Sequence, residues 1–98
     1  MKFGDALAYA REGKKIARRG WNGKGVYVYL TEGRATPTDE WVSRLPSQEI
    51  TEAERETGCV IIKAHLDMMN AEGERIIGWV ATQMDMLATD WCVLKEDE

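Results

Sequence analysis

The stretch Gly20-Trp21-Asn22-Gly23-Lys24-Gly25-Val26-Tyr27-Val28-Tyr29-Leu30 carries the strongest structural signals in the chain. Its Asn22-Gly23 pair favours a tight hairpin turn, because both residues tolerate a positive φ angle. The run that follows, residues 26–30, is rich in β-branched and aromatic side chains and predicts a strand. We expect it to be a central strand, either buried on both faces or completed by a partner subunit.

The segments on either side of this stretch complete an α+β pattern. Apolar residues recur at helical spacing over residues 3–12, and Gly13 follows them as a stop signal. Thr82-Gln83-Met84-Asp85 has capping-box spacing and predicts a brief helix through Leu87. Further strands are expected over residues 15–19, 60–67, 75–80 and 91–94. The predicted fold class is α+β, a small antiparallel sheet flanked by an N-terminal helix and short helices.

The length of 98 residues predicts a single domain, residues 1–98, with a modest core and a need for self-association. Residues 34–58 are the least regular part and include Pro37 and Pro46. We expect them to form an irregular excursion from the sheet that acts as a lid or an oligomer contact. Within it, Thr51-Glu52-Ala53-Glu54 has capping-box spacing and predicts a short helix that stops at Gly58.

Composition narrows the classes of function. A formal net charge of −4 argues against a protein that binds duplex nucleic acid. Basic residues nevertheless crowd residues 11–24, which suits either a compact anionic ligand or a solvated charged face. The start of the chain has no signal-peptide pattern and no segment is apolar enough to span a membrane, so a cytoplasmic protein is expected. Two isolated cysteines favour reduced thiols over a disulfide or a zinc site.

Candidate catalytic groups are few. His65 is the only histidine, and on a strand it would share a face with Asp67, as a base with its orienting group or as a hydrogen-bonded structural residue. Asp85 and Asp90 are a possible carboxylate pair, but Asp85 is explained first as a helix-cap partner. Because no nucleophile motif accompanies them, we predict no enzyme, no catalytic residue, no metal site and no cofactor.

Features that suit binding are more numerous. Trp21 and Trp79 each follow a glycine, so each indole could present a flat face to a nucleobase, although core burial is the ordinary role of tryptophan. The glycines around Lys24 free backbone N–H groups for a pyrophosphate, or they form a plain hairpin turn. Thr82 and Asp85 are reciprocal caps, and Asp85 is also a possible acceptor for ribose hydroxyls.

These pieces occur in the order typical of a known family. The chain resembles the second Thoeris anti-defence protein family of phages. The residues that carry this resemblance are Met1–Leu7, Gly13–Arg18, Gly20–Lys24, His65–Met68, Gly78–Ala88 and Asp90-Trp91. It spans nearly the whole chain except roughly Gly33 to Cys59, and it rests on two separate tryptophan-centred motifs.

The resemblance implies a cytoplasmic protein of the infected host that sequesters an immune signal without cleaving it. Family members form homotetramers and hold cyclic ADP-ribose isomers made by Thoeris sensors, and some also capture cyclic oligonucleotides of CBASS immunity in separate sites. Carried onto this sequence, the resemblance implies that pocket residues lie in two segments, with two weaker aromatic candidates. The segments are Trp21-Asn22-Gly23-Lys24 and Trp79 to Asp85, which includes Thr82, and the weaker candidates are Trp91 and Tyr27.

Two other functions remain open from the sequence. One is a hydrolase that degrades the signal nucleotide with His65 and a carboxylate. The other is an inhibitor that binds a host defence protein directly, with Trp41 and the mid-chain helix as its contact surface.

Overall fold

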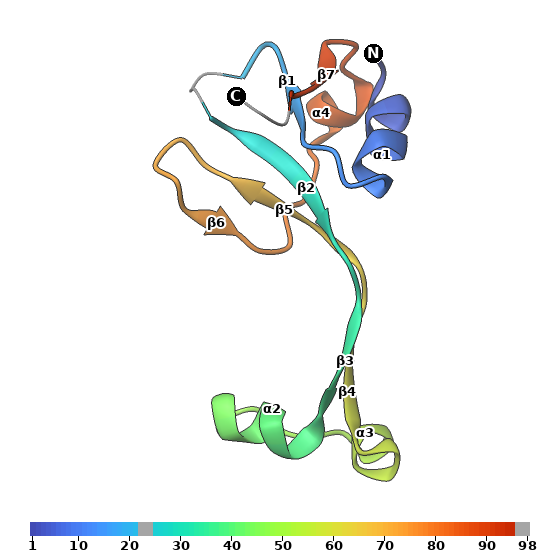
Figure 1. Ribbon diagram of the computed structural model, residues 1–98, viewed down its shortest axis with the longest axis vertical. Coiled ribbons are helices and arrows are strands. Elements are labelled where there is room, and N and C mark those ends of the chain that lie inside the picture. Colours follow the sequence, from blue (N-terminus) through green and yellow to red (C-terminus); the bar gives the residue numbers. More distant parts are fainter. Residues whose placement is uncertain (22–24, 96–98) are drawn as a thin grey trace. The chain divides into compact units, whose positions relative to one another are not determined.

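The computed structural model describes residues 1–21 and 25–95 (Figure 1). The sequence predicts one domain over residues 1–98, whereas the contacts within the chain form two compact units. The larger unit is Met1–Thr31 with His65–Glu98, and the smaller unit is Glu32–Ala64. Each contains its own sheet and helices, so each is described separately.

The larger unit is built on a five-stranded antiparallel sheet with the order β6-β5-β2-β1-β7. β2 lies at its centre, as the strand pattern of residues 26–30 predicts, and the α+β class is confirmed. Among the side chains of β2, only Val28 is fully buried; its neighbours are half-buried. The five strands are β1 (Ile16–Arg18), β2 (Tyr27–Thr31), β5 (His65–Met69), β6 (Arg75–Ile76) and β7 (Trp91–Val93).

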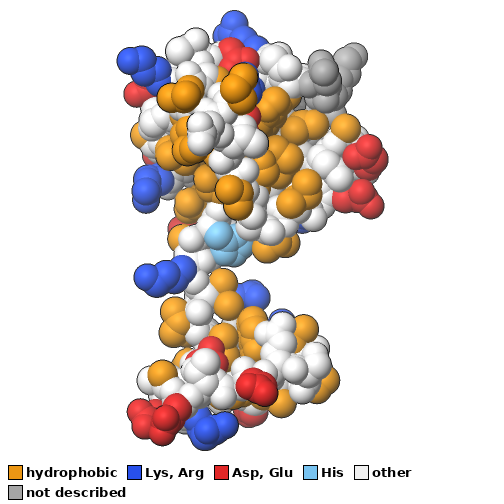
Figure 2. Space-filling view, turned by 180° about the vertical axis from the view of Figure 1, so that it is seen from behind, with side chains coloured by type: hydrophobic (Ala, Val, Ile, Leu, Met, Phe, Trp, Pro, Cys, Tyr) orange, Lys and Arg blue, Asp and Glu red, His pale blue; other side chains and the backbone are white. Residues whose placement is uncertain are grey.

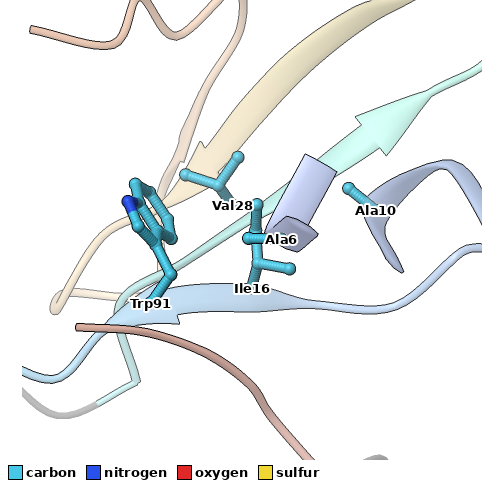
Figure 3. Packing of buried hydrophobic residues seen from close by; sticks show 5 residues of the cluster. All are labelled: Ala6, Ala10, Ile16, Val28 and Trp91. Carbon is cyan, nitrogen blue, oxygen red and sulfur yellow. The ribbon is translucent and has the colours of Figure 1, made fainter. Parts of the chain in front are cut away.

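Helix α1 (Phe3–Arg11) supplies one wall of the core. Ala6 and Ala10 lie one helical turn apart and are fully buried, because small side chains let the helix approach the sheet closely. They pack with Ile16, Val28 and Trp91 to form the core cluster, in which Figure 3 shows the side chains converging between helix and strands. The chain leaves the helix at Gly13, whose φ of +91° confirms the predicted stop.

The C-terminal part of the larger unit contains helix α4 (Gln83–Leu87) between β6 and β7. The predicted capping box is confirmed, since the Thr82 hydroxyl accepts the Asp85 N–H and the Asp85 carboxylate accepts the Thr82 N–H. The predicted strand over residues 75–80 is too long, because β6 ends at Ile76. Gly78 then adopts a φ of +79°, a left-handed conformation that interrupts the strand.

Strand pairing separates the two faces of the larger sheet. Val28 pairs with Met68, and both contribute to the core face. Tyr29 pairs with Asp67, so these two side chains point to the opposite face, together with Tyr27. Alternate residues along β2 and β5 therefore point to opposite faces of the sheet.

The smaller unit is more regular than the predicted irregular excursion over residues 34–58. β3 (Arg34–Pro37) pairs antiparallel with β4 (Cys59–Ile62), and two helices, α2 (Thr38–Arg44) and α3 (Glu52–Thr57), lie between them in sequence. The prolines that suggested irregularity are compatible with regular structure, because Pro37 ends β3 and precedes α2, and Pro46 lies in the turn after α2. The capping box at Thr51 and the left-handed stop at Gly58, with a φ of +76°, are confirmed.

The strand predicted over residues 60–67 is divided in the structure. β4 ends at Ile62 and β5 begins at His65, and the two strands belong to different sheets. Gly33 marks this division within the smaller unit, because a Cβ atom there would lie 2.8 Å from the Ile62 carbonyl oxygen and 3.0 Å from the Ala64 nitrogen. The close backbone approach requires glycine at this position.

Candidate functional site

Three of the four tryptophans meet in one cluster of the larger unit. The ring centroids of Trp21 and Trp91 are 5.3 Å apart, those of Trp21 and Trp79 are 6.1 Å apart, and those of Trp79 and Trp91 are 6.3 Å apart. All three pairs are edge-to-face, the arrangement that aromatic quadrupoles favour. Two motifs that lie far apart in the sequence are therefore joined in space.

The three indoles differ in exposure. Trp91 is only 1% exposed and lies in the core, with its Nε1–H donated to the Asp85 carbonyl at 2.8 Å. Trp21 and Trp79 are half-buried and pack on the outside of that core. Trp21 and Trp79 thus remain partly accessible, while the buried Trp91 packs beneath them.

The glycine before each half-buried tryptophan has a definite structural role. Gly20 donates its N–H to Asp90 Oδ2 at 2.8 Å, and a Cβ there would lie 2.9 Å from that oxygen. Gly78 donates its N–H to Asp67 Oδ1 at 2.8 Å from its left-handed conformation. Larger residues would disturb both contacts, so the two glycines help to fix the position of the tryptophan that follows each of them.

Arg18 connects the two carboxylates near the cluster, a feature that the sequence analysis missed. Its Nε lies 2.9 Å from Asp90 Oδ1, and its Nη1 lies 2.9 Å from Asp85 Oδ1. The hydrogen bond with Asp90 and then that with Asp85 raise the pKa of Arg18 further above its already high value. Asp85 and Asp90 therefore form an ion-pair network with Arg18.

Both carboxylates of this network stay ionised to lower pH than usual. Burial alone would raise the pKa of Asp85, but the Thr82 backbone N–H and the Arg18 guanidinium outweigh it and lower that pKa. The Trp21 indole acts on Asp85 in the same direction. The hydrogen bond from Arg18, followed by that from the Gly20 N–H, lowers the pKa of Asp90. Neither group has the raised pKa expected of a general acid.

Thr82 and Asp85 are brought to the cluster, but their contacts are those of a helix cap. Each oxygen of Asp85 has a partner, with Oδ1 facing Arg18 and Oδ2 accepting the Thr82 N–H at 3.0 Å. Asp85 is also buried, whereas Thr82 is exposed. Thr82 is therefore the more accessible of the two predicted ligand contacts.

Tyr27 is not brought to the tryptophans. It lies on the opposite face of the sheet, beside Tyr29 at a ring-centroid distance of 5.8 Å. The Lys15 Nζ lies 4.8 Å from the centre of the Tyr27 ring, and the Arg75 guanidinium lies 5.5 Å from that of Tyr29. This second face combines aromatic rings with two cations.

The remaining predicted pocket residues, Asn22, Gly23 and Lys24, lie outside the described residues. Gly25, the next described residue, has a φ of +82°, a left-handed conformation that favours glycine. The strands β1 and β2 on either side pair antiparallel through Ile16 and Val28.

His65 and Asp67 share a face of β5, as predicted, and their side chains contact each other. His65 Nδ1 lies 2.8 Å from Asp67 Oδ1, and Asp67 also accepts hydrogen bonds from the Thr31 hydroxyl and the Gly78 N–H. Burial of Asp67, which is 2% exposed, would raise its pKa, but the bonds from Thr31 and Gly78 outweigh burial and lower it. Asp67 thus anchors the turn before Trp79 in addition to pairing with His65.

A cavity of about 490 Å³ lies in the smaller unit and contains none of the predicted site residues. The residues that line the cavity are Thr38, Asp39, Val42, Ser43, Ile50 and Arg55.

Within residues 1–21 and 25–95, no three side chains of His, Cys, Asp or Glu are grouped to hold a metal ion. No helix in this described part of the chain is both long and apolar enough to cross a membrane.

Comparison with known proteins gives the family. A family model described as Thoeris anti-defense 2-like domain matches residues 1–94. The chain belongs to the Thoeris anti-defense 2-like family. Thoeris anti-defense 2 of Bacillus phage SP01 is 28% identical over 94 residues, which cover 96% of this chain and 94% of that protein. The resemblance inferred from the tryptophan motifs is therefore confirmed.

Proposed function

We propose that this chain is a phage anti-defence protein that binds a cyclic ADP-ribose-type signal and sequesters it without cleavage, thereby inhibiting Thoeris defence. Membership of the Thoeris anti-defense 2-like family supports the anti-defence role. The observation that carries the binding role is the meeting of Trp21 and Trp79, two half-buried indoles held edge-to-face over the buried Trp91. Action inside the infected host cell follows from this role.

The ligand class follows from what the cluster offers. An accessible indole face stacks on an adenine ring, a contact worth roughly 1–3 kcal/mol per base in nucleic-acid systems. Lys24 follows Trp21 three residues later in the sequence and is a cation suited to binding a pyrophosphate. Thr82, which caps the helix that contains Asp85, supplies an exposed polar residue for ribose hydroxyls. A nucleotide ring with both adenine and pyrophosphate satisfies all three features.

Sequestration requires no bond to break. The protein has to bind the free signal more tightly than the immune effector does and be present in sufficient amount. The contacts of Asp85 and Asp90 support such a role over hydrolysis, because both carboxylates are paired with Arg18. Each of these carboxylates is used to hold the fold.

The test compares Trp21→Ala and Trp79→Ala with Trp41→Ala, which removes a half-buried tryptophan from the smaller unit. Calorimetry with cyclic ADP-ribose isomers should show binding by wild type and by Trp41→Ala. Each of the other two variants should bind at least about tenfold more weakly, as expected for loss of one stacking contact. Circular dichroism checks that each variant is folded.

Cleavage is tested with the same complex. Heat denaturation after incubation should return intact ligand in near-stoichiometric yield. Accumulation of product over many turnovers would favour the hydrolase instead. Suppression of Thoeris by a protein that binds no nucleotide would favour direct inhibition of a host protein through the surface around Trp41.

A second ligand class is favoured by the opposite face of the sheet. Tyr27 and Tyr29 lie side by side there, with Lys15 and Arg75 over their rings. We propose that this face binds cyclic oligonucleotides of CBASS immunity, separately from the tryptophan cluster. Replacing both tyrosines by alanine should then abolish cyclic dinucleotide binding and leave cyclic ADP-ribose binding unchanged.

We also propose that the chain acts as a homo-oligomer, with a tetramer as the expected state. The larger unit exposes a set of apolar side chains that is unusual for a small monomer, and Figure 2 shows hydrophobic side chains gathered over one of its faces. Subunit contacts over such residues would bury them. The exposed set in residues 76–87 is Ile76, Ile77, Val80, Met84, Met86 and Leu87.

A further inference from the structure

The side chain of Arg18 joins two segments that are distant in sequence. It pairs with Asp85, 67 residues away, and with Asp90, 72 residues away. Strand pairing places Arg18 opposite Trp91, so its side chain points to the core face of the sheet. The guanidinium is well suited to this role, because its fixed planar fork can bind two carboxylates at once.

One arm of this bridge leads to Trp21. Asp90 Oδ2 accepts the Gly20 N–H, and the Asp90 carbonyl accepts the Arg19 N–H at 3.0 Å. Trp21 in turn donates its backbone N–H to the Arg18 carbonyl at 3.2 Å. The backbone that carries the Trp21 indole is therefore held by carbonyls of Arg18 and Asp90 and by the Asp90 carboxylate, which the Arg18 guanidinium binds.

The other arm leads to the surface on which Trp21 packs. Asp85 binds Arg18 through its carboxylate and binds the Trp91 indole N–H through its carbonyl. The orientation of Trp91, 5.3 Å from Trp21, thus depends on the same residue that Arg18 holds. Both sides of the Trp21–Trp91 contact are connected to one guanidinium.

We propose that Arg18 is a positioning residue that sets the orientation of the Trp21 ring and so determines how tightly the tryptophan cluster binds its ligand. This inference rests on the proposed function, in which Trp21 is a wall of the nucleotide pocket. Arg18 need not touch the ligand, because both carboxylate partners already occupy its fork. Removal of the fork leaves two carboxylates near each other and releases the Gly20 turn.

The test is Arg18→Lys, which keeps the charge but replaces the planar fork with a single ammonium group. Near-ultraviolet circular dichroism of wild type and Trp21→Phe first identifies the bands that belong to Trp21. Arg18→Lys should change those same bands and weaken cyclic ADP-ribose binding about tenfold, since small misplacements of a binding group are costly. A residue that only stabilises the fold would lower the melting temperature without altering the Trp21 bands.

The matched control is Arg44→Lys in the smaller unit. Arg44 pairs with Glu40 at 2.9 Å, but both side chains are exposed, and the pair belongs to the smaller unit whereas the tryptophan cluster belongs to the larger one. Its spectrum and affinity should equal those of wild type. If Arg18→Lys does not fold, Asp90→Asn is tested in its place. Its amide oxygen can still accept the Gly20 N–H, whereas Arg18 loses one of its two charged partners and keeps Asp85.

The outcomes separate this inference from the proposed function. Unchanged Trp21 bands and unchanged affinity in Arg18→Lys and Asp90→Asn would overturn the positioning role while leaving sequestration intact. Failure of wild type to bind any cyclic ADP-ribose isomer would overturn the proposed function. In that case the Trp21 bands of the same variants would still decide whether Arg18 orients the ring.

Discussion

Asp67 shows how much one buried side chain can organise in this fold. Its carboxylate accepts from the Thr31 hydroxyl on β2 and from the Gly78 N–H before Trp79, and it pairs with His65 on its own strand. The sequence predicts only the last of these contacts, because positions two apart on a strand share a face. The other two partners come from segments that the sheet brings together.

This carboxylate predicts a specific dependence of stability on pH. Because the pKa of Asp67 is lowered in the folded state, its ionised form stabilises the protein above the unfolded pKa of about 3.9. That contribution is lost as the pH falls through the lower folded value. Asp67→Asn should cost about 2 kcal/mol at pH 7, as expected for hydrogen bonds to a buried charge.

Urea unfolding at pH 7 and at successively lower pH measures this difference. The gap between wild type and Asp67→Asn should begin to narrow below about pH 4, where the carboxyl group of the unfolded chain becomes protonated. It should close as the pH falls through the lower pKa that Asp67 has in the folded protein. Asp5→Asn on the exposed surface of α1 is the control, and it should change stability little at either pH. A gap that stays constant with pH would contradict the assigned charge.

The two capping boxes show that identical local motifs can have different importance. Thr51 and Glu54 cap α3 at an exposed position of the smaller unit. Thr82 and Asp85 cap α4, but the same Asp85 also binds Arg18 and Trp91. Local sequence predicts both caps, and only the surrounding structure distinguishes them.

Thr82→Ala and Thr51→Ala are therefore a matched pair. Each should lower stability by about 1 kcal/mol, the usual cost of a lost helix cap. Thr82→Ala should also weaken binding of cyclic ADP-ribose, because it loosens the helix that orients Asp85. Chemical denaturation measures the stability of both variants, and calorimetry measures their affinity for cyclic ADP-ribose. Equal affinities of Thr82→Ala and Thr51→Ala would contradict a role of α4 in the binding site.

The arrangement of the chain in two units gives each unit a limited core. Helices α2 and α3 bury no side chain, and the buried residues of the smaller unit are Thr36 and Val60. A unit this small rarely stabilises itself without association, a disulfide or a metal. Its exposed Val42, Leu45 and Ile61 are therefore a second set of apolar residues available to another subunit.

Two apolar sets predict two kinds of contact in a tetramer with dihedral symmetry. Ile61→Asp changes the smaller unit, where Ile61 is 63% exposed, and Leu87→Asp changes the larger unit, where Leu87 is 81% exposed. Analytical ultracentrifugation should find a tetramer for wild type, dimers for each single variant and monomers for the double variant. A wild-type monomer, or variants that remain tetrameric, would contradict the proposed assembly.

Rules that act over a few residues were enough to predict much of this protein. The helical spacing of apolar residues predicted α1, and Gly13 predicted its end. The β-branched and aromatic composition of residues 26–30 predicted a central β2, and capping-box spacing predicted α3 and α4. The same rules overestimated the irregularity of residues 34–58. They also missed the break between β4 and β5, because element ends depend on neighbouring backbone such as that at Gly33.

The site itself needed contacts between residues that are distant in sequence. Sequence motifs identified Trp21 and Trp79 as candidates, but they could not show that the two rings meet, or that Tyr27 lies on the other face of the sheet. Arg18 carries no motif, since an arginine becomes a bridge only when the fold brings two carboxylates to it. Backbone propensity is local and depends on neighbouring residues in the sequence. Ion pairing and ring packing depend on which distant segments the fold brings together.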